Sequence, residues 1–289
     1  MTFMKPRNLS PVEYDQILSR FSVRRYLPDK YDHQRINEIK SLSSSGKVLP
    51  LKNVFSCNIF EYDLNRKTSG ALGAFGRIFK APYFLAPYVL GDTKSLIDLG
   101  YRTQQVVLNL WRDGIGSCYI GCVHHQKRVK ELLGLPSDAH IVSLFAFGTP
   151  AQDQSKFFYQ KITQAFAQSK RRLDLNELFL ENSIEKYNRL GENQKKIIEA
   201  GRQAPSATNA QPWRFKIDGD YLVVLANRKP VGKIYDLNQN YLLHDVGICM
   251  ANIDLAGESL GKKIKWEMLA NTHENSEEQL IRIARYKIT

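Results

Sequence analysis

Apolar positions along this chain follow two periods, one typical of helices and one typical of strands. Residues 93–113 and 241–260 carry apolar side chains at helical spacing, which predicts two long helices in a hydrophobic core. Shorter helical patterns occur at residues 32–45, 126–133, 155–168 and 192–202. Runs rich in aromatic and β-branched residues predict strands at residues 53–62, 83–90, 118–120, 140–147, 213–217 and 221–226.

Several of these helices have capping signals at their ends. Residues 10–13 form a capping-box sequence with a proline at the first helical position, so a helix is expected from there to about residue 20. Asp32 opens the second helix, and Gly114 is a stop signal for the helix at residues 93–113.

The pattern recurs in the second half of the chain. Asp98 and Asp245 stand 147 positions apart, and so do Gly114 and Gly261. The same spacing relates Leu108 to Leu255 and Tyr119 to Trp266. A tandem duplication of about half the chain is the simplest explanation. The alternative is that two core helices of similar length both end at a glycine by chance.

Composition narrows the possible settings of the protein. The longest apolar stretch, residues 81–91, is short and contains two prolines, so no membrane-spanning helix is expected. The first residues lack the apolar core of a secretory signal, and four cysteines in 289 residues do not form a disulfide framework. We therefore expect a cytoplasmic protein with reduced thiols.

The balance of charges suggests an anionic partner. Lys and Arg number 41 against 29 Asp and Glu, which gives a formal charge of +12. Such a charge could serve a nucleic acid, an acidic surface or a nucleotide cofactor. Basic residues are spread along the chain, and the run at residues 170–172 is too short for a nucleic-acid tail, so nucleic acid is the least favoured partner.

Two segments have features that packing alone does not require. Arg20, Ser22 and Arg24 alternate after a helix, so two guanidinium groups and a hydroxyl face one side and could bind a phosphate. Residues 204–213 combine two prolines, small residues and side-chain amides, which suits close approach to a flat ring. The alternatives are a solvated basic edge for the first segment and an ordinary turn for the second.

Together the two segments resemble the nitroreductase family of flavin enzymes. In that family an R-x-S-x-R element binds flavin mononucleotide (FMN), and a P-S-x-x-N-x-Q-P-W loop covers the flavin ring. The residues that match the second motif are Pro205, Ser206, Asn209, Gln211, Pro212 and Trp213. Residues 114–121 resemble the family's glycine loop, with Ile120 and Gly121 beside the reactive edge of the flavin. A basic pair that reaches the phosphate is matched by Lys170 and Arg172.

The resemblance implies an α+β fold and a redox function. FMN would carry the chemistry, NAD(P)H would donate electrons, and a nitroaromatic, quinone or similar small molecule would accept them, with no catalytic side chain. Arg24 would lie near N1 and the C2 carbonyl of the ring, and the amide of Gly121 near N5. A flavin-binding protein without turnover, or a structural member of the same fold, is the alternative.

This chain divides the family's motifs between its halves. The first half, residues 1–172, has the phosphate element, whereas the second, residues 173–289, has the ring-covering loop and no second R-x-S-x-R. The expectation is an intramolecular pseudo-dimer with one FMN site, sufficient as a monomer.

Two other clusters of polar residues are assigned no chemistry. Cys118, Cys122, His124 and His125 lie close in sequence, but their spacing is not that of a zinc site. Asp98 and Asp245, where the long helices begin, are interpreted as structural carboxylates.

Overall fold

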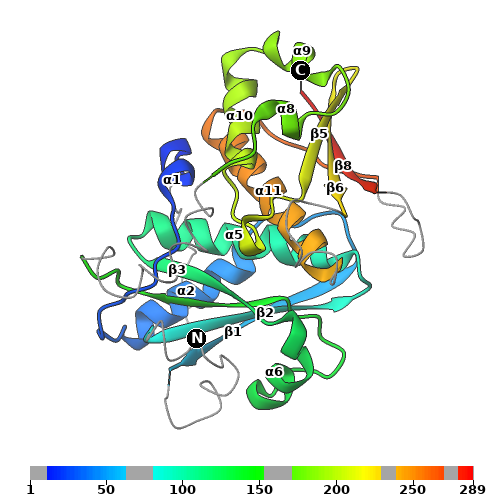
Figure 1. Ribbon diagram of the computed structural model, residues 1–289. Coiled ribbons are helices and arrows are strands. Elements are labelled where there is room, and N and C mark those ends of the chain that lie inside the picture. The colour runs from blue at the N-terminus through cyan, green and yellow to red at the C-terminus, as the bar shows by residue number, and fades with distance from the viewer. Residues whose placement is uncertain (1–11, 63–80, 153–170, 229–238, 270–278, 289) are drawn as a thin grey trace.

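Two four-stranded antiparallel sheets, one from each half of the chain, form the framework (Figure 1). The computed structural model describes residues 12–62, 81–152, 171–228, 239–269 and 279–288. In sheet order, the first sheet contains β1 (Asn53–Glu61), β2 (Tyr83–Gly91), β4 (Ser143–Gly148) and β3 (Gly116–Gly121). The second contains β5 (Trp213–Asp218), β6 (Tyr221–Asn227), β8 (Leu280–Lys287) and β7 (Glu267–Met268). Both sheets therefore place their strands in the order first, second, fourth, third.

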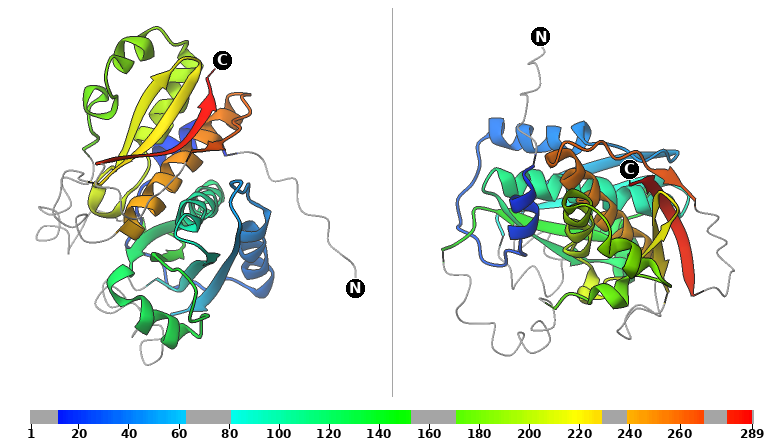
Figure 2. Two further views of the ribbon diagram at one scale, coloured as in Figure 1. Left: turned by 90° about the vertical axis from the view of Figure 1, so that its right-hand side faces the viewer. Right: turned by 90° about the horizontal axis from the view of Figure 1, so that it is seen from above.

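The two long helices that the sequence predicts pack against each other between the sheets (Figures 1 and 2). They are α5 (Ser95–Arg112) and α11 (Gln239–Ser259). A Cβ on Gly100 would lie 1.9 Å from the carbonyl oxygen of His244, and a Cβ on Gly247 would lie 1.9 Å from that of Ile97. Only glycine allows this approach. Gly100 corresponds to Gly247 and Ile97 to His244, each 147 positions apart, so the two contacts are equivalent and the crossing is reciprocal, as in a two-fold symmetric interface.

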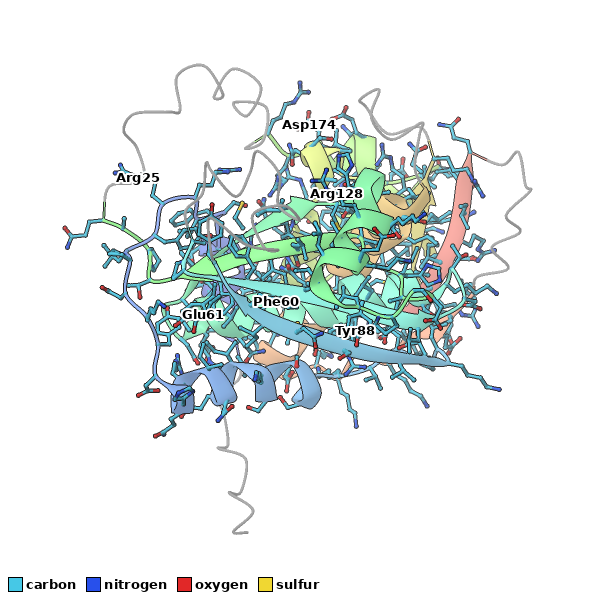
Figure 3. The ribbon with its side chains drawn as sticks, turned by 90° about the horizontal axis from the view of Figure 1, so that it is seen from below. Arg25, Phe60, Glu61, Tyr88, Arg128 and Asp174 are labelled. Atoms are coloured by element: carbon cyan, nitrogen blue, oxygen red, sulfur yellow. The ribbon has the colours of Figure 1, made fainter. Side chains whose placement is uncertain are left out.

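The first sheet is covered on both faces. The helices α2 (His33–Ser45) and α5 share one core with Tyr83 and Phe145. The short η1 (Val123–His125) leads into α6 (Gln126–Leu133), which packs on the other face. Figure 3 shows this second face, with Phe60 and Tyr88 on the strands and Arg128 on α6. Because side chains alternate along a strand, Tyr119 and Gly121 face α5 while Ile120 faces the opposite core.

The first helix packs on the second half of the chain. In α1 (Tyr14–Ser19) the backbone N–H of Tyr14 donates to Ser259 Oγ at 2.9 Å. The chain then runs extended to the first sheet, where Val23 N donates to the Ser117 carbonyl oxygen at 2.9 Å. The expected start of this helix near residue 10 is wrong, because Glu13 and Gln16 form the capping box one turn later.

Most of the predicted elements are present, with a few corrections. The strand expected from residue 140 begins at Ser143, and His140 makes only an isolated bridge to Val89. The sequence analysis did not predict β7 or β8, or α8 (Leu175–Leu178) and α9 (Ser183–Asn188). In contrast, α10 (Glu192–Arg202) has the predicted bounds. The helix expected at residues 155–168 lies outside the described residues.

Candidate functional site

The R-x-S-x-R element lies along the edge of the first sheet, beside β3. Val23 is fully buried there, and a Cβ on Gly116 would come within 2.5 Å of its Cγ2. Burial lowers the pKa of Arg20; Tyr119 and Cys118 oppose that shift, and Arg24 adds to it. Ser22 hydrogen-bonds to the Cys118 thiol, whose pKa is raised by burial. Arg20, Ser22 and Arg24 are therefore partly buried beside β3 and do not form a fully solvated basic edge.

A second guanidinium meets this element from the other side. Arg172 Nη1 donates to Asn209 Oδ1 at 2.6 Å, and its Nη2 donates to the Gln203 carbonyl oxygen at 3.1 Å. Burial, together with the positive charges of Arg20 and Arg202, lowers the pKa of Arg172 to about 10. Like charges brought together in a partly dehydrated place raise each other's free energy, and an anion relieves that penalty. The predicted neighbour Lys170 lies outside the described residues.

The amides of the loop at residues 204–213 fix the segment that carries Arg172. Asn209 Nδ2 and Gln211 Nε2 both donate to the Arg171 carbonyl oxygen, at 2.8 and 3.1 Å. Gln211 Oε1 accepts from Leu173 N at 2.9 Å. The resemblance assigns both amides to the flavin. In the structure their described contacts position Arg172, and a direct contact with flavin stays a prediction.

The same loop has a strained backbone. Thr208, Asn209 and Gln211 have positive φ values of 52°, 60° and 48° within η3 (Ala207–Asn209) and just after it. Left-handed conformations at residues other than glycine cost on the order of 1–3 kcal/mol each, with Asn at the low end, and they cluster at functional sites. Ser206 Oγ stabilises the turn by accepting from Gln211 N at 2.9 Å. A simple connecting turn would not need three such residues.

A carboxylate from α11 holds the beginning of this loop. Asp245 Oδ2 accepts from the backbone N–H of Ala207 at 2.8 Å. Asp98, its counterpart on α5, accepts from the N–H of Leu49 at 2.9 Å. Both side chains are buried, so the structural role predicted for these two carboxylates agrees with their contacts.

Glycine at position 121 leaves room for a side chain from the other half. A Cβ on Gly121 would lie 2.3 Å from the hydroxyl of Tyr241, which accepts from Val123 N at 3.4 Å. Burial raises the pKa of Tyr241 to about 12, so its hydroxyl stays neutral. Ile120 is buried on the opposite face of the sheet, so a contact from Ile120 to a ligand here would use its backbone.

His244 is a polar residue of this region that the sequence analysis missed. Only 2% of it is exposed, and its ring lies edge-on to the Tyr119 ring with centroids 6.1 Å apart. A lone histidine in an apolar helix gives no motif. The one available signal is the repeat, which pairs it with Ile97 and so places a polar side chain where the other half has an apolar one.

Two features are absent from the described residues, a cluster of metal ligands and a helix that could span a membrane. Among the residues described, no three His, Cys, Asp or Glu side chains gather as metal ligands would. Within the same residues, no helix is both long enough and apolar enough to cross a membrane.

Comparison with solved structures gives the class of fold. A structure described as a "putative nitroreductase" from Thermotoga maritima matches all of this chain and 98% of its own length, with a TM-score of 0.60 and 17% identity. Nitroreductase A from Vibrio parahaemolyticus matches 61% of this chain and 81% of its own, with a TM-score of 0.43 and 20% identity. The NADPH:FMN oxidoreductase of Vibrio harveyi, solved with NAD+, matches 56% of this chain and 80% of its own, with a TM-score of 0.43 and 19% identity. The first of these matches, which covers the whole chain, shows that the fold is that of a nitroreductase.

A family model gives the membership. The model described as "Putative TM nitroreductase" matches residues 13–257, which is most of the chain. No curated protein matches the sequence. The chain belongs to this nitroreductase family.

Proposed function

We propose that this chain is an FMN-dependent oxidoreductase that passes electrons from NAD(P)H to a nitroaromatic, quinone or similar small acceptor. The observation that carries the proposal is the approach of Arg20 and Arg172, which lie far apart in the sequence, to a common partly buried place. Family membership supports a redox function, and the Vibrio harveyi neighbour is named for NADPH and FMN.

The residues present fit an FMN phosphate and ring. Arg20, Ser22 and Arg172 would hold the phosphate, since guanidinium forks and a hydroxyl match its oxygens, and Lys170 would join them. Arg24 would lie near N1 and the C2 carbonyl of the ring, where its charge favours the reduced form. Gly121 has no side chain to keep the ring away from its backbone amide.

The protein's part in this chemistry is binding and orientation. FMN, when bound, supplies the electron transfer, and solvent can supply protons. The loop at residues 204–213 holds Arg172 in place and, with Pro205 and Ser206, covers one side of the proposed ring site. The other side is left for NAD(P)H and the acceptor in turn.

One FMN per chain is the expected stoichiometry. We infer that residues 1–172 and 173–289 are duplicated units that pack as an intramolecular pseudo-dimer. The shared strand order and the reciprocal glycine contacts support this inference. Because the phosphate element and the covering loop come from different units, the two units together would complete one site, without a second chain.

The test is to measure flavin content, assembly and turnover on one preparation. The protein is reconstituted with excess FMN, separated by size with light scattering, and the flavin released on denaturation is identified and counted. One FMN on a monomer is expected. Two per chain would refute the single-site claim, and flavin bound only to a dimer would refute self-sufficiency.

A turnover assay separates an enzyme from a binding protein. NADH and NADPH are each supplied with a quinone or a nitroaromatic acceptor, and oxidation is followed spectrophotometrically. Turnover that depends on FMN is expected. Stoichiometric FMN without turnover would support the non-catalytic alternative, and absence of FMN binding would refute the proposal.

A further inference from the structure

The two ring nitrogens of His244 have different surroundings. Its Nδ1 lies 3.2 Å from Asp245 Oδ1. Its Nε2 is buried and has no hydrogen-bond partner among the residues that the structure describes. Buried polar side-chain atoms are paired in the large majority of cases, so an exception in a candidate site calls for a ligand or a water molecule.

The neighbour of Nδ1 decides what Nε2 can do. An ionised carboxylate only accepts hydrogen bonds, so Nδ1 carries the proton and donates to Asp245. In the neutral ring Nε2 then presents a lone pair and acts as an acceptor. Asp245 is itself fixed by the N–H of Ala207, so the orientation of the imidazole depends on the loop at residues 204–213.

The position of His244 relates this acceptor to the proposed flavin site. Tyr119, which its ring contacts, stands two residues before Gly121 on the same face of β3. Tyr119 also lies close enough to Arg20 for the guanidinium to lower its pKa, against a larger opposing effect of burial. His244 therefore lies between the strand that carries Gly121 and the loop that holds Arg172.

We propose that His244 Nε2 accepts a hydrogen bond from an N–H or O–H group of the bound flavin. This proposal rests on the proposed function. Two kinds of donor share this chemistry: groups present in both redox states, such as the ring imide N–H or a ribityl hydroxyl, and an N–H that the ring gains on reduction. His244 is a positioning and tuning residue here, one that no matched motif includes.

The experiment compares the full chain with His244→Phe and His244→Gln. Phenylalanine fills similar space without an acceptor, whereas the glutamine carbonyl can still accept. The exposed His33→Gln serves as the matched control. We expect His244→Phe to bind oxidised FMN about ten-fold more weakly if the donor exists in both states. If the donor appears only on reduction, the affinity for oxidised FMN should stay unchanged. The midpoint potential of the bound flavin should then fall by about 30 mV, which corresponds to a ten-fold loss of affinity for the two-electron reduced flavin. In either case His244→Gln should keep most of the wild-type affinity or potential, because its carbonyl can still accept the hydrogen bond.

A second measurement does not depend on the variants folding. Long-range 1H–15N spectra of the histidine rings are recorded on the wild type without and with FMN. The Nε2 signal of His244 should change on adding FMN, while the signals of His33 stay fixed. If the wild type binds FMN and neither this signal nor the affinity nor the potential of His244→Phe changes, the inference is wrong while the proposed function stands. If the wild type binds no FMN, the proposed function fails first.

Discussion

On one flank of the α5–α11 pair Asp245 accepts from the N–H of Ala207, and on the other Asp98 accepts from that of Leu49. The edge strands keep the same register as well. Cys122 N donates to the Val142 carbonyl oxygen, and Leu269 N, 147 positions after Cys122, donates to the Ile283 carbonyl oxygen, 141 positions after Val142; both distances are 2.9 Å. These matched hydrogen bonds identify which residues of the two flanks correspond.

The corresponding side chains differ in chemistry. Where the candidate site has Tyr119, Gly121, His244 and Tyr241, the other flank has Trp266, Met268, Ile97 and Lys94. Met268 has a side chain at the position where Gly121 leaves room for the hydroxyl of Tyr241. The backbone arrangement is thus common to both flanks, whereas the residues suited to a polar ligand occur on only one.

The cations on the two flanks also have different partners. Lys47, in the loop at residues 46–53, makes salt bridges to Asp254 at 2.6 Å and Glu258 at 2.9 Å. These carboxylates raise the pKa of Lys47 despite burial, which acts the other way. On the side of the candidate site, the positive charge of Arg20 lowers the pKa of Arg172, and that of Arg24 lowers the pKa of Arg20. On the flank with Asp98, the protein's own carboxylates neutralise the charge of Lys47. On the flank with the candidate site, the arginine charges suit an added anion.

The largest expected effect tests the part that the flanks share. Gly100→Ala and Gly247→Ala should each lower the free energy of unfolding by about 3 kcal/mol, because the new methyl group meets a helix backbone that cannot move alone. The double variant should lose less than the sum, since one separation of the helices relieves both contacts. Urea unfolding measures all three. If only one of the two single variants lost much stability, the reciprocal crossing of the helices would be contradicted.

Removing Arg20 should affect only the candidate site. Arg20→Ala should weaken FMN binding by about 1.5–3 kcal/mol, the range for a hydrogen bond to a charged group. Arg25→Ala removes the same charge nearby, at the margin of the molecule (Figure 3), and should leave the affinity within about 0.5 kcal/mol. Fluorescence titration with FMN measures both. Equal affinities for Arg20→Ala and the wild type would remove Arg20 from the site.

A smaller effect is expected from the amide that positions Arg172. Asn209→Gly keeps the left-handed backbone but removes the acceptor of Arg172, and should weaken FMN binding by about 1 kcal/mol. On the other flank, the amide of Gln105 holds both the N–H and the carbonyl of Lys47. Gln105→Ala should lower stability without changing FMN affinity. If both variants weaken FMN equally, the flanks are not functionally distinct.

The smallest effect concerns the pH dependence of stability. Burial raises the pKa of Asp98, opposed by the N–H of Leu49 and the charge of Arg102. A raised pKa in the folded state means that the folded form binds the proton more tightly, so this contribution is present at low pH and lost as pH rises through the raised pKa. The wild type should therefore gain stability relative to Asp98→Asn, by less than about 1 kcal/mol, as pH falls from 7 to 4. Melting temperatures of both proteins across that range measure it.

Local signals in the sequence account for much of the fold. Asp32 caps α2 as predicted, its side chain accepting from Arg35 N at 2.7 Å, and the bounds of α6 and α10 agree with their apolar periods. The start of α1 was wrong because the Glu13–Gln16 pair supplies a closer cap. The two-residue β7 has too few positions to show a period, and its partner β8 specifies it through long-range pairing.

The candidate site could be predicted only in part, since a motif shows residue types but not their partners. The alternation of Arg20, Ser22 and Arg24 indicated an anion site before any contact was known. Nothing local could show that Asn209 and Gln211 clamp residues 171–173, because those contacts join segments about 40 positions apart in the chain. His244 gave no signal alone, since its surroundings arise from the crossing of two helices.

The contact between α1 and the second half has a consequence for the order of synthesis. Tyr14 and Ser259 are 245 positions apart, and α1 packs on α10 and α11 as well as on α5. At about 5–20 residues per second, a ribosome needs roughly 12–50 s after making α1 to supply its partner. The first sheet and α5 can assemble during that interval, but Arg20 lies directly after a helix whose other two partners, α10 and α11, are still to be made. The nascent chain therefore cannot complete the anion site until α11 has emerged.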